Sequence, residues 1–84
     1  MMNYIIESYI KNLSYEDYNN FLISNNIIIN YKINIYFFDI LKNNYKDILK
    51  RPEYYLNIIK NNVDSNTYNK LYDLYSTYSK KLYH

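Results

Sequence analysis

The chain has 84 residues, a formal net charge of +2, a single Pro and neither Cys nor Gly. Its length allows one domain with a single modest core, and the lack of Cys excludes disulfides and thiolate metal sites. Asn, Tyr, Ile and Lys dominate the composition. Codon usage in an AT-rich genome explains this bias, so the number of lysines does not by itself indicate an anionic partner.

The sequence lacks the features of a signal peptide or a membrane span. Its first residues, MMNYIIESYIKN, have no basic n-region and carry Glu7 within the apolar stretch, which is not typical of a signal peptide. The longest run without charged residues, 18–31, contains five Asn and is too short and too polar to cross a bilayer. We therefore expect a cytoplasmic protein, and the lack of Cys is compatible with a reducing compartment.

Helix starts are predicted from capping residues. Ser14 followed by Asp17 forms a variant of the capping box, and Asp64 has the chemistry of a second N-cap. Pro52 and the acidic residue after it suit the first turn of another helix. Together with the apolar spacing, these signals predict five helices, at about 2–12, 15–25, 31–43, 52–61 and 65–82.

Helix ends are predicted from paired asparagines. In a chain without Gly, Asn is the residue that best tolerates the positive φ of a helix C-terminus. The pairs at 25–26, 43–44 and 61–62 are each followed by an apolar residue. We therefore expect Asn26, Asn44 and Asn62 to end helices in Schellman turns, with 27–30 as an extended connector and 45–50 as a compact connector or a single turn.

The predicted helices each carry apolar residues at spacings of three and four, as amphipathic helices do. The first stripe includes Met2 and Ile6, and the third includes Phe37 and Ile40. These stripes predict an all-α fold, a compact bundle of about five short helices that forms a single domain over residues 1–84.

The tyrosines of the last helix follow the same spacing. Tyr75 and Tyr78 share a stripe with leucines and are expected to form the core wall, with their hydroxyls at its margin. Tyr72 and Tyr83 lie toward the edge of the stripe and are expected to be more exposed.

Catalytic and cofactor-binding arrangements are not found in the sequence. Without Cys, and with His84 as the single His, no Cys-His or Ser-His-Asp constellation and no zinc site is expected. The absence of Gly excludes the phosphate-binding fingerprints of nucleotide enzymes. The carboxylates are dispersed without calcium-loop spacing. We expect no enzyme activity, no cofactor and no metal.

A basic segment is the one charge feature that could bind a ligand. In KNNYKDILKR, basic residues recur around one aromatic ring, an arrangement that could hold a nucleic-acid backbone and stack a base. The candidate nucleic-acid patch consists of Lys42, Tyr45, Lys46, Lys50 and Arg51. The alternative explanation is a solvated face or a helix end, where cations favour the helix dipole.

A second candidate surface is apolar. Several apolar residues fall outside the helical stripes, and tyrosine-rich patches suit interfaces because a ring offers large area at low entropic cost. The candidate protein interface consists of Ile35, Phe38, Tyr54, Ile58 and Tyr72. The alternative is that the third helix is central and buried all round.

Two resemblances accompany these patterns. The connector 27–30 and its flanking helices resemble the SAP-type DNA-binding motif, of whose basic residues only Lys32 is present. The helix start at Leu13-Ser14, the connector 26–29 and the start at Val63-Asp64 resemble a family of short helical proteins of unknown function from low-GC Gram-positive bacteria. That family implies the fold and no activity.

We therefore predict a small non-catalytic helical protein that acts by macromolecular interaction, with another protein or with itself as a homo-oligomer. The alternatives are a nucleic-acid or ribosome-associated accessory module that uses the basic patch, and a small inhibitor or adaptor from a phage or other mobile element.

Overall fold

The chain is all-α. The computed structural model describes residues 8–82, with side chains as far as 77, and these residues contain no strand. Residues 8–12 are helical and are followed by four longer helices: α2 (Tyr15–Ser24), α3 (Tyr31–Lys50), α4 (Pro52–Lys60) and α5 (Ser65–Leu82). The all-α prediction is confirmed. The start of the predicted first helix, with Met2 and Ile6, lies outside the described residues. So do Tyr83, His84 and the side chain of Tyr78, so the predictions made for them are not tested.

The predicted starts of α2, α4 and α5 are confirmed. The Ser14 hydroxyl accepts a hydrogen bond from the backbone N–H of Asp17 at 3.1 Å, and the Asp64 carboxylate accepts one from Thr67 N–H at 2.7 Å. Pro52 is at the start of α4, where its missing N–H costs nothing. The position of the α3 start was predicted, but its cap was not. The Asn30 side chain caps this helix by accepting a hydrogen bond from the N–H of Lys32 at 2.9 Å.

Asn26 ends the α2 segment as predicted. It has φ 64°, the one positive φ among the described non-glycine residues. The N–H of Ile27 donates to the carbonyl of Leu22, and the N–H of Asn26 to that of Ile23, both at 2.9 Å. This is the hydrogen-bond pattern of a Schellman turn. Leu22 and Ile27, the apolar pair that the turn brings together, are 4% and 2% exposed.

The pairs at 43–44 and 61–62 do not form the Schellman turns that were predicted for them, so this part of the prediction is wrong. Asn44 has φ −132° and interrupts the regular helix at a kink, beyond which 45–50 form a short helical segment as far as Lys50. The interruption at Asn44 and the helical turn that the sequence allowed for 45–50 are therefore present. Asn62 does not have a positive φ. The C-cap of α4 is instead Asn61, whose backbone stays in the right-handed helical region. The Asn62 amide donates to the Ile58 carbonyl at 2.7 Å, which satisfies one of the last carbonyls of the helix by a side chain.

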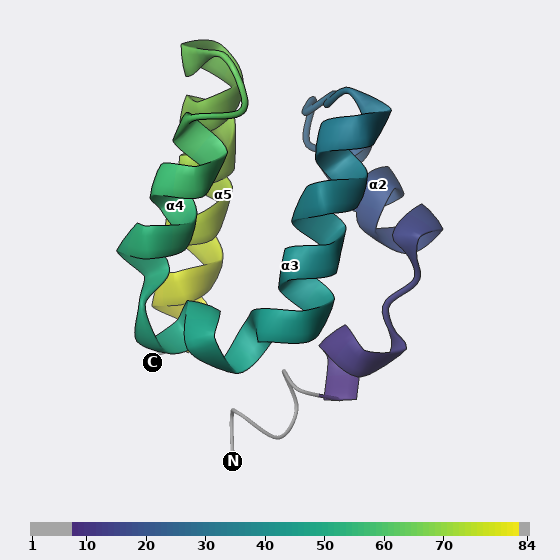
Figure 1. Ribbon diagram of the computed structural model, residues 1–84, viewed down its shortest axis with the longest axis vertical. Helices are drawn as coiled ribbons and strands as arrows, with labels where there is room; N and C mark the ends of the chain where they lie inside the picture. Colours follow the sequence, from purple (N-terminus) through teal and green to yellow (C-terminus); the bar gives the residue numbers. More distant parts are fainter. Residues whose placement is uncertain (1–7, 83–84) are drawn as a thin grey trace.

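The helices form two antiparallel pairs joined by the corner after α3. Figure 1 shows α2 beside α3 and α5 behind α4, with the kinked end of α3 running between the two pairs. The whole measures 35 × 23 × 22 Å. Lys70 of α5 donates to the carbonyl of Asn26 at 3.0 Å and so connects the second pair to the turn after α2.

Full burial is confined to one pair. The buried apolar side chains of the described region are Leu22, Ile27 and Phe37, from α2, the connector and α3. Within this pair, Phe38 packs its ring against Tyr15 and Tyr18, with centroids 5.7 and 5.3 Å apart. No described side chain of α4 or α5 is fully buried. The α2–α3 pair is therefore the core of the molecule, and the second pair is packed against it more loosely.

The positive φ of Asn26 generates the first prediction. Asn26→Ala should lower the free energy of unfolding by about 1 kcal/mol, because a Cβ without a polar side chain is disfavoured at this conformation. Asn26→Gly should cost nothing. The matched control is Asn44→Ala, at a negative φ, which should change stability by less than about 0.5 kcal/mol. Urea unfolding measures all three, and equal costs for the two Ala variants would contradict the assignment.

Candidate functional site

Lys42, the first residue of the predicted basic patch, is part of the fold. Its ammonium group donates to three backbone carbonyls at the end of the first helical segment, those of Ile10 at 3.0 Å, Lys11 at 2.7 Å and Leu13 at 2.9 Å. The same group lies 5.8 Å from the centre of the Phe38 ring. A lysine has three N–H donors, so contact with a phosphate would require Lys42 to leave these carbonyls.

Arg51, the last residue of the patch, belongs to a cluster at the α3–α4 corner. Its guanidinium donates to both oxygens of the Asp47 carboxylate, from Nε at 3.1 Å to Oδ1 and 3.2 Å to Oδ2, and from Nη2 at 2.5 Å to Oδ2. The Tyr55 hydroxyl donates to the same carboxylate at 2.6 Å, and the Tyr54 ring lies 4.8 Å from the guanidinium carbon. This cluster joins the last turn of α3 to the first turns of α4.

The electrostatics of the corner follow from these bonds. The hydrogen bond from Arg51, followed by that from Tyr55, lowers the pKa of the Asp47 carboxyl. The same carboxylate raises the pKa of the Tyr55 hydroxyl, because it accepts a hydrogen bond only while that hydroxyl keeps its proton. The remaining patch residues differ in exposure: Tyr45 is half-buried, whereas Lys46 and Lys50 are exposed. Binding of nucleic acid by these residues stays a prediction.

The residues of the predicted protein interface are dispersed. Phe38 packs against α2, and Ile35 is half-buried. Ile58 lines a cavity between the two helix pairs. Tyr54 is exposed but covers Arg51. Tyr72 alone among them lines a groove open to solvent, on the side of α4 and α5. The structure therefore does not bring these five residues onto one surface.

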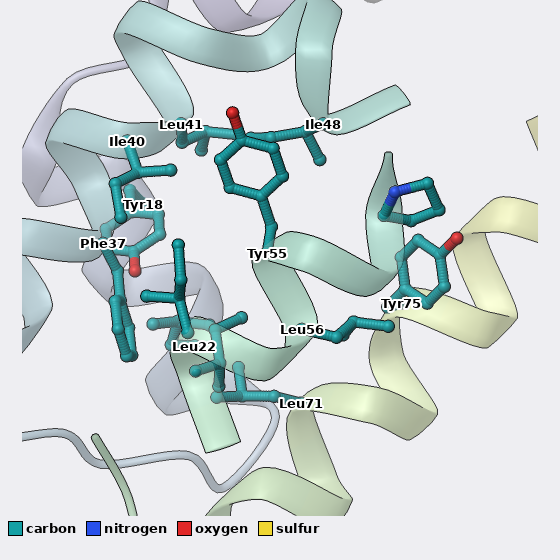
Figure 2. Close-up of a pocket in the computed structure, with 13 residues that line it drawn as sticks. Tyr18, Leu22, Phe37, Ile40, Leu41, Ile48, Tyr55, Leu56, Leu71 and Tyr75 are labelled. Atoms are coloured by element: carbon teal, nitrogen blue, oxygen red, sulfur yellow. The ribbon is translucent and has the colours of Figure 1, made fainter. Parts of the chain in front are cut away.

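The cavity lies where the two helix pairs face each other. It has a volume of about 210 Å³ and is lined by side chains from α2, α3, α4 and α5. Figure 2 shows Tyr55 near its centre, with Phe37 and Tyr18 on one side and Leu56 and Tyr75 on the other. No charged side chain lines it. Its wall is therefore apolar except for tyrosine hydroxyls.

The groove lies between α4 and α5 and is more polar. It has a volume of about 360 Å³. Three tyrosines of α5 follow one another along it, with the centre of the Tyr72 ring 6.2 Å from that of Tyr68 and 6.3 Å from that of Tyr75. From α4 come Leu56 and the exposed polar residues Glu53, Asn57 and Lys60. Tyr75, predicted as core wall, is 36% exposed and borders both the groove and the cavity.

Sequence reasoning missed the polar contact inside the α2–α3 pair. Asn34 is completely buried, and its amide donates to Asn19 Oδ1 at 2.9 Å and to the Tyr15 hydroxyl at 3.4 Å. Its own Oδ1 has no hydrogen-bond partner. A signal was present, because Asn34 precedes Phe37 by three residues and Leu41 by seven and so falls on the buried stripe.

Comparison with known proteins gives no relative. No protein-family model, no curated protein and no solved structure matches the chain. The resemblance to short helical proteins of low-GC Gram-positive bacteria therefore stays a prediction. Within residues 8–82, no helix has the length and apolar character that a membrane crossing needs, and no three His or acidic side chains gather as metal ligands would.

The bonds of Lys42 generate the second prediction. Lys42→Met keeps most of the apolar stem and removes the ammonium, so the free energy of unfolding should fall by about 1–2 kcal/mol as three carbonyls lose a charged donor. Lys50→Met, at an exposed position of the same helix, should cost less than about 0.5 kcal/mol. Urea unfolding of both variants checks this, and a negligible effect of Lys42→Met would refute the structural role.

The corner cluster generates a prediction about pH. Because the folded pKa of Asp47 is lowered, its contribution to stability should be complete above the unfolded pKa of about 3.9 and disappear as the pH falls through the folded value. Asp47→Asn should therefore be less stable than the parent near neutral pH, and the two should converge in acid. Urea unfolding across this range measures the difference; a constant difference would contradict the ion pair.

Proposed function

We propose that the chain is a non-catalytic helical protein that binds a partner protein through the groove between α4 and α5. The observation that carries this proposal is the row formed by Tyr68, Tyr72 and Tyr75, whose rings follow one another along the groove. Tyr72 is 44% exposed and Tyr75 36%. A large part of each ring is therefore open to solvent, although each is held by its neighbour.

Tyrosines held in this way suit a protein interface. A tyrosine ring buries a large apolar area on binding and has only two side-chain torsions to fix. Tyr72 is flanked by a ring on each side, so its side chain is already restricted in the free protein and loses less entropy on binding. Their hydroxyls can exchange hydrogen bonds with a partner's backbone and side chains.

The rim of the groove has the polar character that interfaces have around an apolar centre. Glu53 stands near the start of α4 and Lys60 at its end, with Asn57 between them. Opposite charges at the two ends would orient a partner segment along the groove, with its own basic residue toward Glu53 and its acidic residue toward Lys60. Leu56 provides apolar surface beside the tyrosines.

The other functions have less support. A catalytic role lacks candidate residues, since the sequence has no Cys and its single His is His84. The nucleic-acid alternative depends on five residues, of which Lys42 is bonded to carbonyls and Arg51 to Asp47. A role as an inhibitor or adaptor from a phage or mobile element is a form of the same protein interaction, with a particular partner.

The proposed function can be tested by affinity capture from the native host, with nuclease present, followed by calorimetry with the recovered partner after its purification. Tyr72→Ala should weaken binding of that partner by about 30-fold or more. This corresponds to a loss of about 2 kcal/mol of binding free energy, which is typical for truncation of a central interface residue.

The matched control is Tyr9→Ala, which removes a ring that is 63% exposed and does not line the groove. This variant should bind the partner within about twofold of the parent. Circular dichroism of both variants checks that the helices remain. If Tyr72→Ala binds as well as Tyr9→Ala, the groove is not the contact surface. If recovery requires intact nucleic acid, the nucleic-acid alternative replaces the proposal.

A further inference from the structure

The cavity between the two helix pairs can hold a small neutral molecule. Its volume of about 210 Å³ exceeds the roughly 150 Å³ of an engineered apolar cavity that stays dry and binds benzene. No charged side chain lines the wall, so an ion would lose its hydration without compensation. Four of the lining side chains are aromatic rings that could contact a guest ring edge to face: Tyr18, Phe37, Tyr55 and Tyr75.

The cavity is partly open to solvent, so a guest can enter it without unfolding of the chain. Leu22 and Phe37 are the buried ones among its lining side chains, and Tyr75 at the opposite wall is partly exposed. Water in such a space meets few polar partners. Its displacement by an apolar molecule is therefore favourable.

Among the three tyrosine hydroxyls of the wall, that of Tyr18 is the one that both lies among the lining side chains and makes no hydrogen bond with a described residue. The hydroxyl of Tyr55 is engaged by Asp47, and Figure 2 shows the Tyr75 oxygen on the side of its ring away from Leu56. Tyr18, by contrast, makes no hydrogen bond through its hydroxyl with any described residue, and Figure 2 shows this oxygen among the lining side chains.

The Tyr18 hydroxyl is also fixed in place and neutral. Its ring packs against Phe38 at 5.3 Å and Tyr15 at 6.0 Å, so the hydroxyl is held in position before any guest arrives. Burial, followed by the neighbouring Tyr15, raises the pKa of Tyr18. The group therefore keeps its proton at neutral pH and can donate it in a hydrogen bond.

We propose that this cavity binds a small neutral aromatic molecule that carries one hydroxyl or carbonyl group, and that the Tyr18 hydroxyl donates a hydrogen bond to that group. The aromatic part of the guest lies among the apolar side chains of the two helix pairs, and Tyr18 selects for the polar substituent. The cavity shares Pro52, Leu56 and Tyr75 with the groove, but Tyr18 and Leu22 line the cavity alone. A test that is read at these two residues therefore does not depend on the proposed protein partner.

The experiment compares p-cresol with toluene as probes, because the two differ in one hydroxyl group. Binding is read from the methyl signals of Leu22 and Leu71 in ¹H–¹³C NMR titrations of the full chain. Both probes should shift these signals, and p-cresol should bind about threefold to tenfold more tightly, the gain from one net hydrogen bond. In Tyr18→Phe this preference should disappear while toluene still binds.

Two controls keep the outcome decisive. Tyr9→Phe removes an exposed hydroxyl outside the cavity and should leave the preference unchanged. Leu71→Phe places a larger side chain in the wall and should weaken the binding of both probes, which in this variant is read from the Leu22 methyl signals alone. The proposal is overturned if toluene leaves the Leu22 and Leu71 signals unmoved up to its solubility limit, or if Tyr18→Phe still prefers p-cresol. Circular dichroism of each variant confirms that it is folded.

Discussion

The architecture depends on a left-handed turn made without glycine. Asn26 takes a positive φ, which lets the chain reverse after α2 and brings Ile27 back onto Leu22. These two side chains, with Phe37 of α3, are the buried apolar core of the described residues. The direction in which α3 leaves the turn then determines where Phe38 meets α2 and where Lys42 meets the carbonyls of the first helical segment. A residue with a branched side chain at position 26 would oppose all of these contacts at once.

How much the sequence could predict depended on the range of the interaction. The N-caps at Ser14 and Asp64 were predicted correctly, because each cap bonds to a residue only three positions further along the sequence. The breaks near Asn44 and Asn62 were placed correctly, but their Schellman geometry was wrong. An asparagine can close a helix through its side chain or keep a negative φ, and the pair alone does not distinguish these outcomes. The candidate sites were harder still. The partners of Lys42 lie 29 to 32 residues away, and no local pattern indicated them.

The tyrosine-rich composition serves two structural purposes. In α2, tyrosine rings replace aliphatic core: Tyr15 and Tyr18 enclose Phe38, while the Tyr15 hydroxyl accepts from buried Asn34. In α5 they stand at the surface, where Tyr72 and Tyr75 are partly exposed along the groove. The position of a tyrosine relative to the α2–α3 core determines whether its ring is packed or accessible. The spacing of residues in the sequence does not contain this information, so it could not show that Tyr75 is partly exposed.

Burial is unequal in the two helix pairs, and this has a consequence for motion. Leu22, Ile27, Asn34 and Phe37 lie in the α2–α3 half, whereas no described side chain of α4 or α5 is fully buried. Segments with few buried contacts unfold locally at lower free energy than the rest of a protein. We therefore expect the α4–α5 hairpin to open locally at a lower free energy than the α2–α3 half, with loss of the Lys70–Asn26 hydrogen bond. Because the cavity is lined from both halves, such opening would widen it without global unfolding.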